Sequence, residues 1–347
     1  MPPVDREPGG CDELVTLLEV RDVTKGFEVR TRAFTRSKGT LTAVKSVSLQ
    51  IEKGETLGLV GESGCGKSTL GRMVVRLLEP SSGEVRLSGV LHGSDDPALR
   101  RSVQIIFQDP YTSLPPKMRV RRILAEPLLI HKIVPEDQVE SRVRKLLDDV
   151  GLKAEHADSF ASELSGGQRQ RVSIARALAV EPELIVADEA VSALDVSVQA
   201  QILNLMRDLQ ETRGIAYLFI SHDLGVVRYM SHRIAVMYLG EIVELGTADD
   251  VAERPLHPYT KALLSAVPTI HGNVSAPGAR SEPPNPANPP SGCSFHPRCS
   301  WAQDVCSLDS PHLIEWKPGH HAACHFALEV FESSENRDVE SPLGGRG

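Results

Sequence analysis

The chain has 347 residues, and its 38 Lys and Arg against 46 Asp and Glu give a formal net charge of −8 at pH 7. This length is enough for one large domain with additions, or for two ordinary domains. The acidic balance provides no overall basic field for a phosphate backbone, so nucleic acid is not expected as the principal partner.

The N-terminal segment has none of the features of a secretory signal. Residues 1–13 lack a basic start, an apolar stretch and a small-residue cleavage site, so we expect a flexible N-terminus and a cytosolic protein. Apolar runs such as "GIAYLFI" are far shorter than the roughly 20 residues of a membrane-spanning helix. Because the cytosol is reducing, clustered cysteines there indicate metal or redox chemistry rather than disulfides.

The first elements are predicted to be short strands. They occupy residues 14–60, and the last of them, "TLGLV", is a continuous apolar run typical of a strand buried on both faces. The intervening "EVRTRAFTRSKG" is rich in basic residues. It is expected to be a solvated hairpin extension, with contact to lipid or a membrane protein as the alternative.

Helical periodicity dominates from about residue 95 to 180. The stretch "VESRVRKLLDDVGL" places an apolar stripe on one face and stops at Gly151. Strands return as "ELIVADE" and "GIAYLFIS", with the helix "SVQAQILNLMRDLQETR" between them. Alternating buried strands and helices predict an α/β fold with a mostly parallel sheet and a helical insertion.

The composition changes after about residue 267. Residues 271–291 contain six prolines and are predicted to be a linker. Residues 268–332 form a predicted C-terminal extension that carries four of the chain's six cysteines, Cys293, Cys299, Cys306 and Cys324. The polar residues 333–347 are predicted to be a disordered tail.

"GESGCGKST", residues 61–69, directly follows a predicted buried strand and has the pattern of a phosphate-binding loop. Its glycines let successive N–H groups face one point, and the next helix adds the positive end of its dipole. Lys67 can reach the β- and γ-phosphates, while the Ser68 hydroxyl can ligate Mg²⁺. Cys65 is expected to fill space, or alternatively to be a redox-sensitive thiol. The predicted nucleotide-binding residues are Gly61, Glu62, Ser63, Gly64, Cys65, Gly66, Lys67, Ser68 and Thr69.

A second anion-facing segment is predicted at "LSGGQ". Ser165 is a natural N-cap for the following helix, and two glycines leave helix-start amides open to an anion. The residues of this segment are Leu164, Ser165, Gly166, Gly167 and Gln168.

Adjacent carboxylates end the predicted strand "ELIVADE". Asp188 can hold hydrated Mg²⁺, and Glu189 can orient or deprotonate an attacking water. Gln108, at the end of another strand, could sense Mg²⁺ and this water, and His222 in "SHDL" could contact a γ-phosphate. The predicted catalytic residues are Lys67, Gln108, Glu189 and His222, and the predicted Mg²⁺ ligands are Ser68, Gln108 and Asp188.

Six segments in order resemble the motifs of the ATP-binding cassette (ABC) family. "GESGCGKST", "FQDP", "LSGGQRQR", "LIVADEA", "SALD" and "SHD" are similar to its Walker A, Q-loop, signature, Walker B, D-loop and H-loop motifs. The resemblance covers about residues 14–267. It implies a P-loop NTPase nucleotide-binding domain with a RecA-like core, an antiparallel β subdomain and a helical subdomain at about 95–180.

The same resemblance implies ATP and Mg²⁺ in a head-to-tail pair of domains. Each ATP would lie between the Walker A loop of one chain and the signature segment of the other, and closure would drive a permease. Phe27 would stack on adenine, or alternatively lie in the core. Ala190 stands where the family usually has proline after Walker B, and Pro115 where asparagine is expected after the Q-loop. The D-loop residues are Ser192, Ala193, Leu194 and Asp195.

The C-terminal segments "HPYTKALLSAVP", "PPSGCSFHPRCSWA" and "HHAACHF" resemble the extension of oligopeptide and dipeptide importers, in particular their second, F-type ATPase subunit. This implies a heterodimer with a related ATPase, two transmembrane permeases, an extracytoplasmic peptide-binding protein, and a peripheral position on the cytoplasmic face of the membrane. The alternatives are the same role for nickel or glutathione, or a soluble cassette ATPase acting on ribosomes or DNA.

The four clustered cysteines are separated by five, six and seventeen residues, unlike the short gaps of zinc ribbons. The resemblance implies a [4Fe–4S] cluster, with Zn²⁺ or unmetallated thiols as alternatives. Such a site would stabilise a small appendage beyond the linker, away from ATP.

Overall fold

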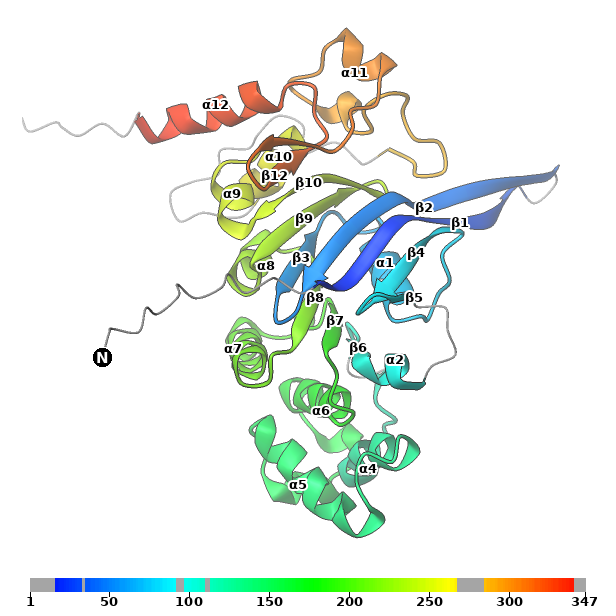
Figure 1. Cartoon of the computed structure of the whole chain (residues 1–347), viewed down its shortest axis with the longest axis vertical. Helices are drawn as coiled ribbons and strands as arrows, with labels where there is room; N and C mark the ends of the chain where they lie inside the picture. The colour runs from blue at the N-terminus through cyan, green and yellow to red at the C-terminus, as the bar shows by residue number, and fades with distance from the viewer. Residues whose placement is uncertain (1–15, 33–34, 92–96, 110–112, 267–283, 340–347) are drawn as a thin grey trace, which may run out of the picture.

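The computed structural model describes residues 16–32, 35–91, 97–109, 113–266 and 284–339. The predicted flexible segment 1–13 and most of the predicted linker 271–291 lie outside these ranges. The molecule is elongated, with the sheets in the middle, the helical region at one end and the C-terminal extension at the other (Figure 1).

An eight-stranded sheet forms the centre, in the order β11-β12-β10-β9-β3-β8-β7-β6. The parallel strands are β3 (Thr56–Val60), β6 (Val103–Ile106), β7 (Leu184–Asp188), β8 (Ala216–Ser221) and β9 (Arg233–Tyr238). The antiparallel strands are β10 (Glu241–Thr247), β11 (Ile314–Lys317) and β12 (His320–Ala322). Strands β3, β7 and β8 are buried at every position. The predicted α/β fold with a mostly parallel sheet is therefore confirmed.

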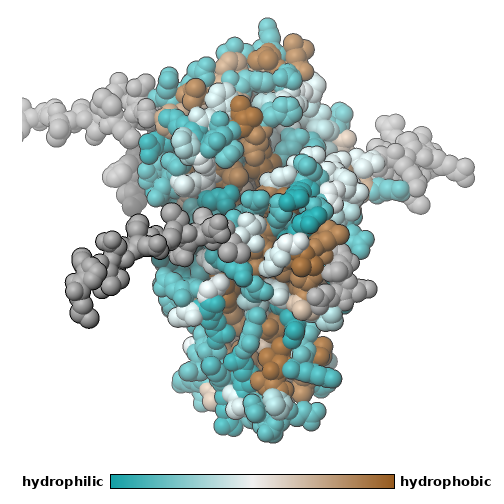
Figure 2. Space-filling view, viewed as in Figure 1, coloured by the Kyte–Doolittle hydropathy of each residue, from teal (hydrophilic) through white to brown (hydrophobic). Residues whose placement is uncertain are grey.

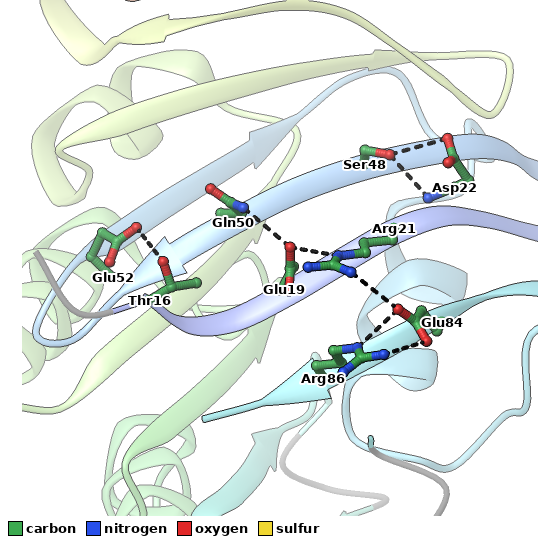
Figure 3. A network of polar contacts seen from close by, with 9 residues as sticks. All are labelled: Thr16, Glu19, Arg21, Asp22, Ser48, Gln50, Glu52, Glu84 and Arg86. Atoms are coloured by element: carbon green, nitrogen blue, oxygen red, sulfur yellow. Dashed lines mark hydrogen bonds and ion pairs between the residues drawn. The ribbon is translucent and has the colours of Figure 1, made fainter. Parts of the chain in front are cut away.

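A second, antiparallel sheet has the order β2-β1-β4-β5. Its strands are β1 (Thr16–Arg32), β2 (Thr35–Glu52), β4 (Ser82–Leu87) and β5 (Val90–Leu91). The predicted short strands are in fact two long strands, and the predicted hairpin extension is their antiparallel pairing as far as Arg32 and Thr35. A polar network links β1 and β4: Arg21 on β1 donates to Glu84 on β4 at 3.5 Å, and Arg86 donates to the same carboxylate at 2.8 Å (Figure 3).

The helical region differs from its predicted bounds of about 95 to 180. Strand β6 lies inside that range but pairs in parallel with β7, so the helical insertion begins after β6. Helix α5 buries the predicted apolar stripe and stops before Gly151, whose φ is +67°. Helix α2 (Pro97–Ser102) precedes β6. The helices after β6 are α4 (Val120–Ile130), α5 (Val139–Asp149) and α6 (Gly166–Leu178), with 3₁₀ turns Glu136–Gln138, Ala154–Asp158 and Ala161–Glu163.

The remaining helices cover the central sheet and build the extension. They are α1 (Lys67–Val74), α7 (Val196–Arg213), α8 (Leu224–Met230), α9 (Ala248–Glu253), α10 (Pro258–Ala266), the 3₁₀ turn His296–Arg298, α11 (Asp304–Leu308) and α12 (Ala327–Val339). Among the described residues, no helix is both long and apolar enough to cross a membrane. The face in Figure 2 is largely hydrophilic. Hydrophobic residues lie among the hydrophilic ones, including some at the top of the view, where Figure 1 places α11.

The C-terminal extension continues the central sheet instead of forming a separate appendage. Strand β12 pairs with β10, which places Ala322 opposite Glu244. The buried Glu244 carboxylate accepts hydrogen bonds from both sides of this junction, including one of 2.8 Å from His320. Helix α12 runs to Val339, so the predicted boundary of a disordered tail at 333 falls inside a helix, and residues 340–347 lie outside the description.

Candidate functional site

The loop 61–69 connects β3 to α1 and requires glycine at two positions. A Cβ on Gly61 would lie 2.1 Å from the Met237 carbonyl oxygen. Gly66 has φ +115°, and a Cβ there would lie 2.2 Å from the Ala43 carbonyl oxygen. The Cys65 side chain is buried, as expected of a space-filling residue. The close approach of other backbone therefore fixes the curl of the loop.

The lysine of this loop is turned toward the loop itself. Lys67 is only 4% exposed, and its Nζ donates to the carbonyl oxygens of Gly61 (2.7 Å) and Glu62 (2.9 Å). Ser63 and Gly64, at the tip, are exposed. This arrangement places a positive charge under an accessible turn that opens helix α1.

Two oxygen ligands suited to Mg²⁺ meet beside the loop. The Ser68 hydroxyl donates to Asp188 Oδ1 at 2.7 Å. Burial raises the pKa of Asp188, while the hydrogen bond from Ser68 opposes that change. A hydroxyl and a buried carboxylate are hard oxygen donors, so this pair fits the predicted metal.

Three strand ends bring the predicted catalytic side chains together. The Gln108 amide, after β6, donates to Glu189 Oε2 at 2.8 Å, and His222 Nδ1, after β8, lies 3.4 Å from the same oxygen. Glu189 has φ +48°, a conformation that costs free energy in a residue with a side chain and occurs most often at functional sites. Its backbone is fixed by a 3.0 Å hydrogen bond to Ile220. Gln108 contacts Glu189 here, and its role as an Mg²⁺ ligand stays a prediction.

The segment 164–168 starts helix α6 as the sequence predicts. The N–H of Gln168 donates to Ser165 Oγ at 3.3 Å, and the N–H of Ser165 donates to Gln168 Oε1 at 3.0 Å, which confirms the N-cap. A Cβ on Gly167 would lie 2.5 Å from a side-chain carbon of Val198, so α6 and α7 pack closely there. Leu164 is buried, whereas Gly166 is half-buried.

The predicted D-loop and adenine-stacking residues are accessible. Ser192, Ala193 and Asp195 are exposed, and Leu194 is half-buried. Phe27 on β1 is 36% exposed, with Lys25 Nζ 5.5 Å from the centre of its ring. The alternative of a core position for Phe27 is therefore wrong, and stacking on adenine stays a prediction.

The four clustered cysteines line one small cavity in the extension. Its volume is about 10 Å³, and His296 and His325 also border it. Burial raises the pKa of Cys299 to about 11 and that of Cys324 to about 12. Across the described ranges, however, no three His, Cys, Asp or Glu side chains are already arranged as ligands of a metal ion.

Two side chains outside the predicted site contact the loop 61–69. The N–H of Glu62 donates to Tyr259 Oη on α10 at 2.8 Å. Arg298, from the turn between Cys293 and Cys299, donates to both carboxylate oxygens of Glu62. Neither contact could be read from the sequence, because both residues lie about 200 or more positions away from Glu62. The extension therefore contacts the nucleotide-binding loop through Arg298, while the expectation that its four cysteines do not touch ATP stays a prediction.

A glycine-rich loop on a helix start, beside adjacent carboxylates at the end of strand β7, defines a nucleotide-hydrolysing protein of the P-loop class. Two family models match the chain. One is described as "ABC transporter" and matches residues 44–192, and the other, "Oligopeptide/dipeptide transporter, C-terminal region", matches residues 243–306.

Similar proteins match most of the chain. The oligopeptide transport ATP-binding protein AppF of Bacillus subtilis (strain 168) is 48% identical over 89% of this chain and 97% of its own length. The di/tripeptide transport ATP-binding protein DppF of Pseudomonas aeruginosa (strain UCBPP-PA14) is 46% identical over 90% and 98%.

Solved structures of similar fold point to the same family. A post-hydrolysis dimer of the ATP-binding cassette MJ0796, bound to ADP and Pi, matches with a TM-score of 0.59 at 29% identity, over 67% of this chain and 99% of that one. CbiO1 of Clostridium perfringens matches with a TM-score of 0.59 at 28% identity, over 70% and 92%. The chain belongs to the ABC transporter family, as its motifs predict, and is an ATPase of that family.

Proposed function

We propose that this ATPase drives the import of oligopeptides or dipeptides through a core of two permeases. The observation that carries the proposal is the match of residues 243–306 to the C-terminal region of oligopeptide and dipeptide transporters, on a chain nearly half identical to AppF. We further propose a heterodimer with a related ATPase at the cytoplasmic face of the membrane, supplied by an extracytoplasmic peptide-binding protein.

In this proposal ATP lies between the loop 61–69 of this chain and the signature segment of the partner. Glu189 orients or deprotonates the attacking water, and the contacts of Gln108 and His222 with its carboxylate hold it in place. Ser68 and Asp188 hold Mg²⁺, which supplies charge neutralisation on the phosphates. Exposure of the D-loop is consistent with contact to a second ATPase.

The four cysteines are proposed to hold a metal centre, with [4Fe–4S] as the first candidate and Zn²⁺ as the second. Four thiolates are a ligand set that both groups use, and here all four cysteines border one cavity. A cavity of about 10 Å³ has room for one small ion. A four-iron cluster would require Cys293, Cys299, Cys306 and Cys324 to move apart.

The transport proposal is tested by deleting the protein and measuring uptake of labelled di-, tri- and oligopeptides. We expect uptake to be lost, to return with the wild-type chain, and to stay lost with Glu189→Gln. Normal peptide uptake, with loss of nickel or glutathione uptake instead, contradicts the peptide assignment. Purification from detergent-solubilised membranes should recover two permeases, and recovery only with ribosomes or DNA contradicts a transport role.

The metal proposal is tested by anaerobic purification of the full chain and metal analysis. About four irons per chain with absorbance near 400 nm support the cluster, whereas zinc without iron supports the mononuclear site. A Cys306→Ser chain should lose the metal in either case. Wild-type protein free of both metals contradicts the proposal.

A further inference from the structure

The C-terminal extension reaches into the nucleotide-binding loop through one side chain. Arg298 Nη1 donates to Glu62 Oε2 at 2.9 Å, and Nη2 donates to Glu62 Oε1 at 2.8 Å. The two groups lie 236 positions apart in the chain. A planar guanidinium that meets a carboxylate with two parallel hydrogen bonds fixes orientation as well as distance.

Aromatic side chains enclose this ion pair. The Arg298 side chain is only 4% exposed, against 27% for Glu62. Its guanidinium lies 5.9 Å from the centre of the Tyr238 ring and 5.7 Å from that of Phe295. Nη1 also lies 3.4 Å from Tyr238 Oη. Because the guanidinium is buried, salt screens this pair less than a pair between two exposed side chains.

Glu62 is held at three places. Arg298 holds its carboxylate, Tyr259 accepts a hydrogen bond from its N–H, and Lys67 donates to its carbonyl oxygen at 2.9 Å. The backbone of Glu62 therefore sets where the loop begins to curl and where the Lys67 ammonium lies. A shift of Glu62 would move both the phosphate-facing backbone and this ammonium.

The turn that presents Arg298 is built between two of the clustered cysteines. The N–H of Cys293 donates to the carbonyl of Cys306 at 2.8 Å, and the N–H of Arg298 donates to that of Phe295 at 3.0 Å. Cys299 follows Arg298 directly, and both flanking cysteines border the four-cysteine cavity. A change at these thiols therefore acts on the segment that carries the guanidinium.

We propose that Arg298 is a positioning residue for the ATP site: it fixes the nucleotide-binding loop through Glu62, so that the four-cysteine segment sets the nucleotide affinity of its own chain. This role concerns nucleotide binding and is independent of the solute carried. It also gives the extension a function in the ATPase besides any metal that the cysteines hold.

The test measures the dissociation constant of a non-hydrolysable ATP analogue with Mg²⁺, using the full-length chain and isothermal titration calorimetry. The variants are Arg298→Met, Glu62→Gln and the double variant. Each single variant should weaken binding by about fivefold or more, as expected for loss of a charge-assisted bidentate contact. The double variant should bind no more weakly than the weaker single variant, because both remove the same contact.

Arg233→Met provides the matched control. Arg233 begins β9 and pairs at 3.0 Å with Glu55, which directly precedes β3. Both residues lie at the end of these strands away from the loop 61–69, so the substitution removes a similar ion pair far from the loop. The affinity of the Arg233→Met chain for the ATP analogue should stay within about twofold of wild type, a difference in binding free energy below about 0.4 kcal/mol. Unchanged affinity in both single variants, or effects that multiply in the double variant, contradict the proposal.

Two further measurements separate positioning from folding. Arg298→Lys keeps the charge but loses the two-pronged geometry, so it should fold and bind with an intermediate affinity; wild-type affinity contradicts a need for that geometry. In the assembled transporter Arg298→Met should raise KM for ATP more than it lowers kcat, and the reverse split contradicts a role in binding. Cys299→Ser should weaken binding in the wild-type chain but not further in Arg298→Met; no effect in the wild-type chain, or equal effects in both, contradicts transmission through Arg298.

Discussion

Glu244→Gln tests how the extension is joined to the ATPase. The Glu244 carboxylate is fully buried on β10, where β12 of the extension pairs with it. It accepts four hydrogen bonds, from Leu256 N (2.8 Å), His257 N (2.9 Å), Thr260 Oγ1 (2.5 Å) and His320 Nε2 (2.8 Å). The substitution keeps the shape of the side chain but replaces one accepting oxygen by a donating NH₂ group.

The expected loss of stability follows from the number of hydrogen-bond donors around the carboxylate. Each carboxylate oxygen serves two donors, so two donors lose their acceptor and face another donor instead. Hydrogen bonds to a charged group contribute about 1.5–3 kcal/mol each, and breaking a buried charged contact costs about 3–5 kcal/mol. We expect the free energy of unfolding to fall by about 3–5 kcal/mol. For a urea slope of about 3 kcal/mol per M, the midpoint falls by about 1 M or more.

Tryptophan fluorescence measures this change at the junction. Both tryptophans of the chain, Trp301 and Trp316, lie in the extension, and Trp316 Nε1 donates to Ala322 of β12 at 3.0 Å. Glu315→Gln is the matched control: that exposed carboxylate accepts a hydrogen bond from the Gly319 N–H at a surface turn, and the substitution should change stability by less than about 0.5 kcal/mol. A Glu244→Gln chain with the wild-type fluorescence midpoint would refute the assignment of this carboxylate to the junction.

Three further outcomes are expected. Glu189→Gln should retain ATP binding but lose about 100-fold or more of the phosphate-release rate in the assembled transporter, and an unchanged rate removes this side chain from its proposed role. Gly66→Ala should impair nucleotide binding far more than Gly64→Ala, because its Cβ would meet the Ala43 carbonyl at 2.2 Å while that of Gly64 meets nothing within 4 Å; equal binding contradicts this. Burial lowers the pKa of His257 to about 3, so below about pH 6.5 the unfolded chain takes up a proton that the folded chain excludes, and stability is lost as pH falls from about 6.5 toward 3. Urea unfolding should show about 2 kcal/mol less stability at pH 5 than at pH 7 from this group, and a His257→Asn chain with the same pH slope contradicts it.

Local sequence patterns were sufficient to predict most of the elements of the ATPase core. Continuous apolar runs predict the buried strands β3, β7 and β8, because strands covered on both faces have no polar alternation. The cap at Ser165 follows from local hydrogen-bond chemistry over three residues. The helical insertion begins later than its predicted bound near residue 95, because the strand predicted to end near Gln108 is β6, and its parallel pairing with β7 makes it part of the central sheet.

The sequence by itself determined the chemistry of this protein. The loop 61–69 and the carboxylates Asp188 and Glu189 are local features, since each depends on a few adjacent residues at the end of a strand. Only the tertiary structure decided that the extension completes the central sheet and that Arg298 holds Glu62. Contacts between positions 236 residues apart depend on how strands are ordered in the sheet, and no local pattern in one sequence encodes that order.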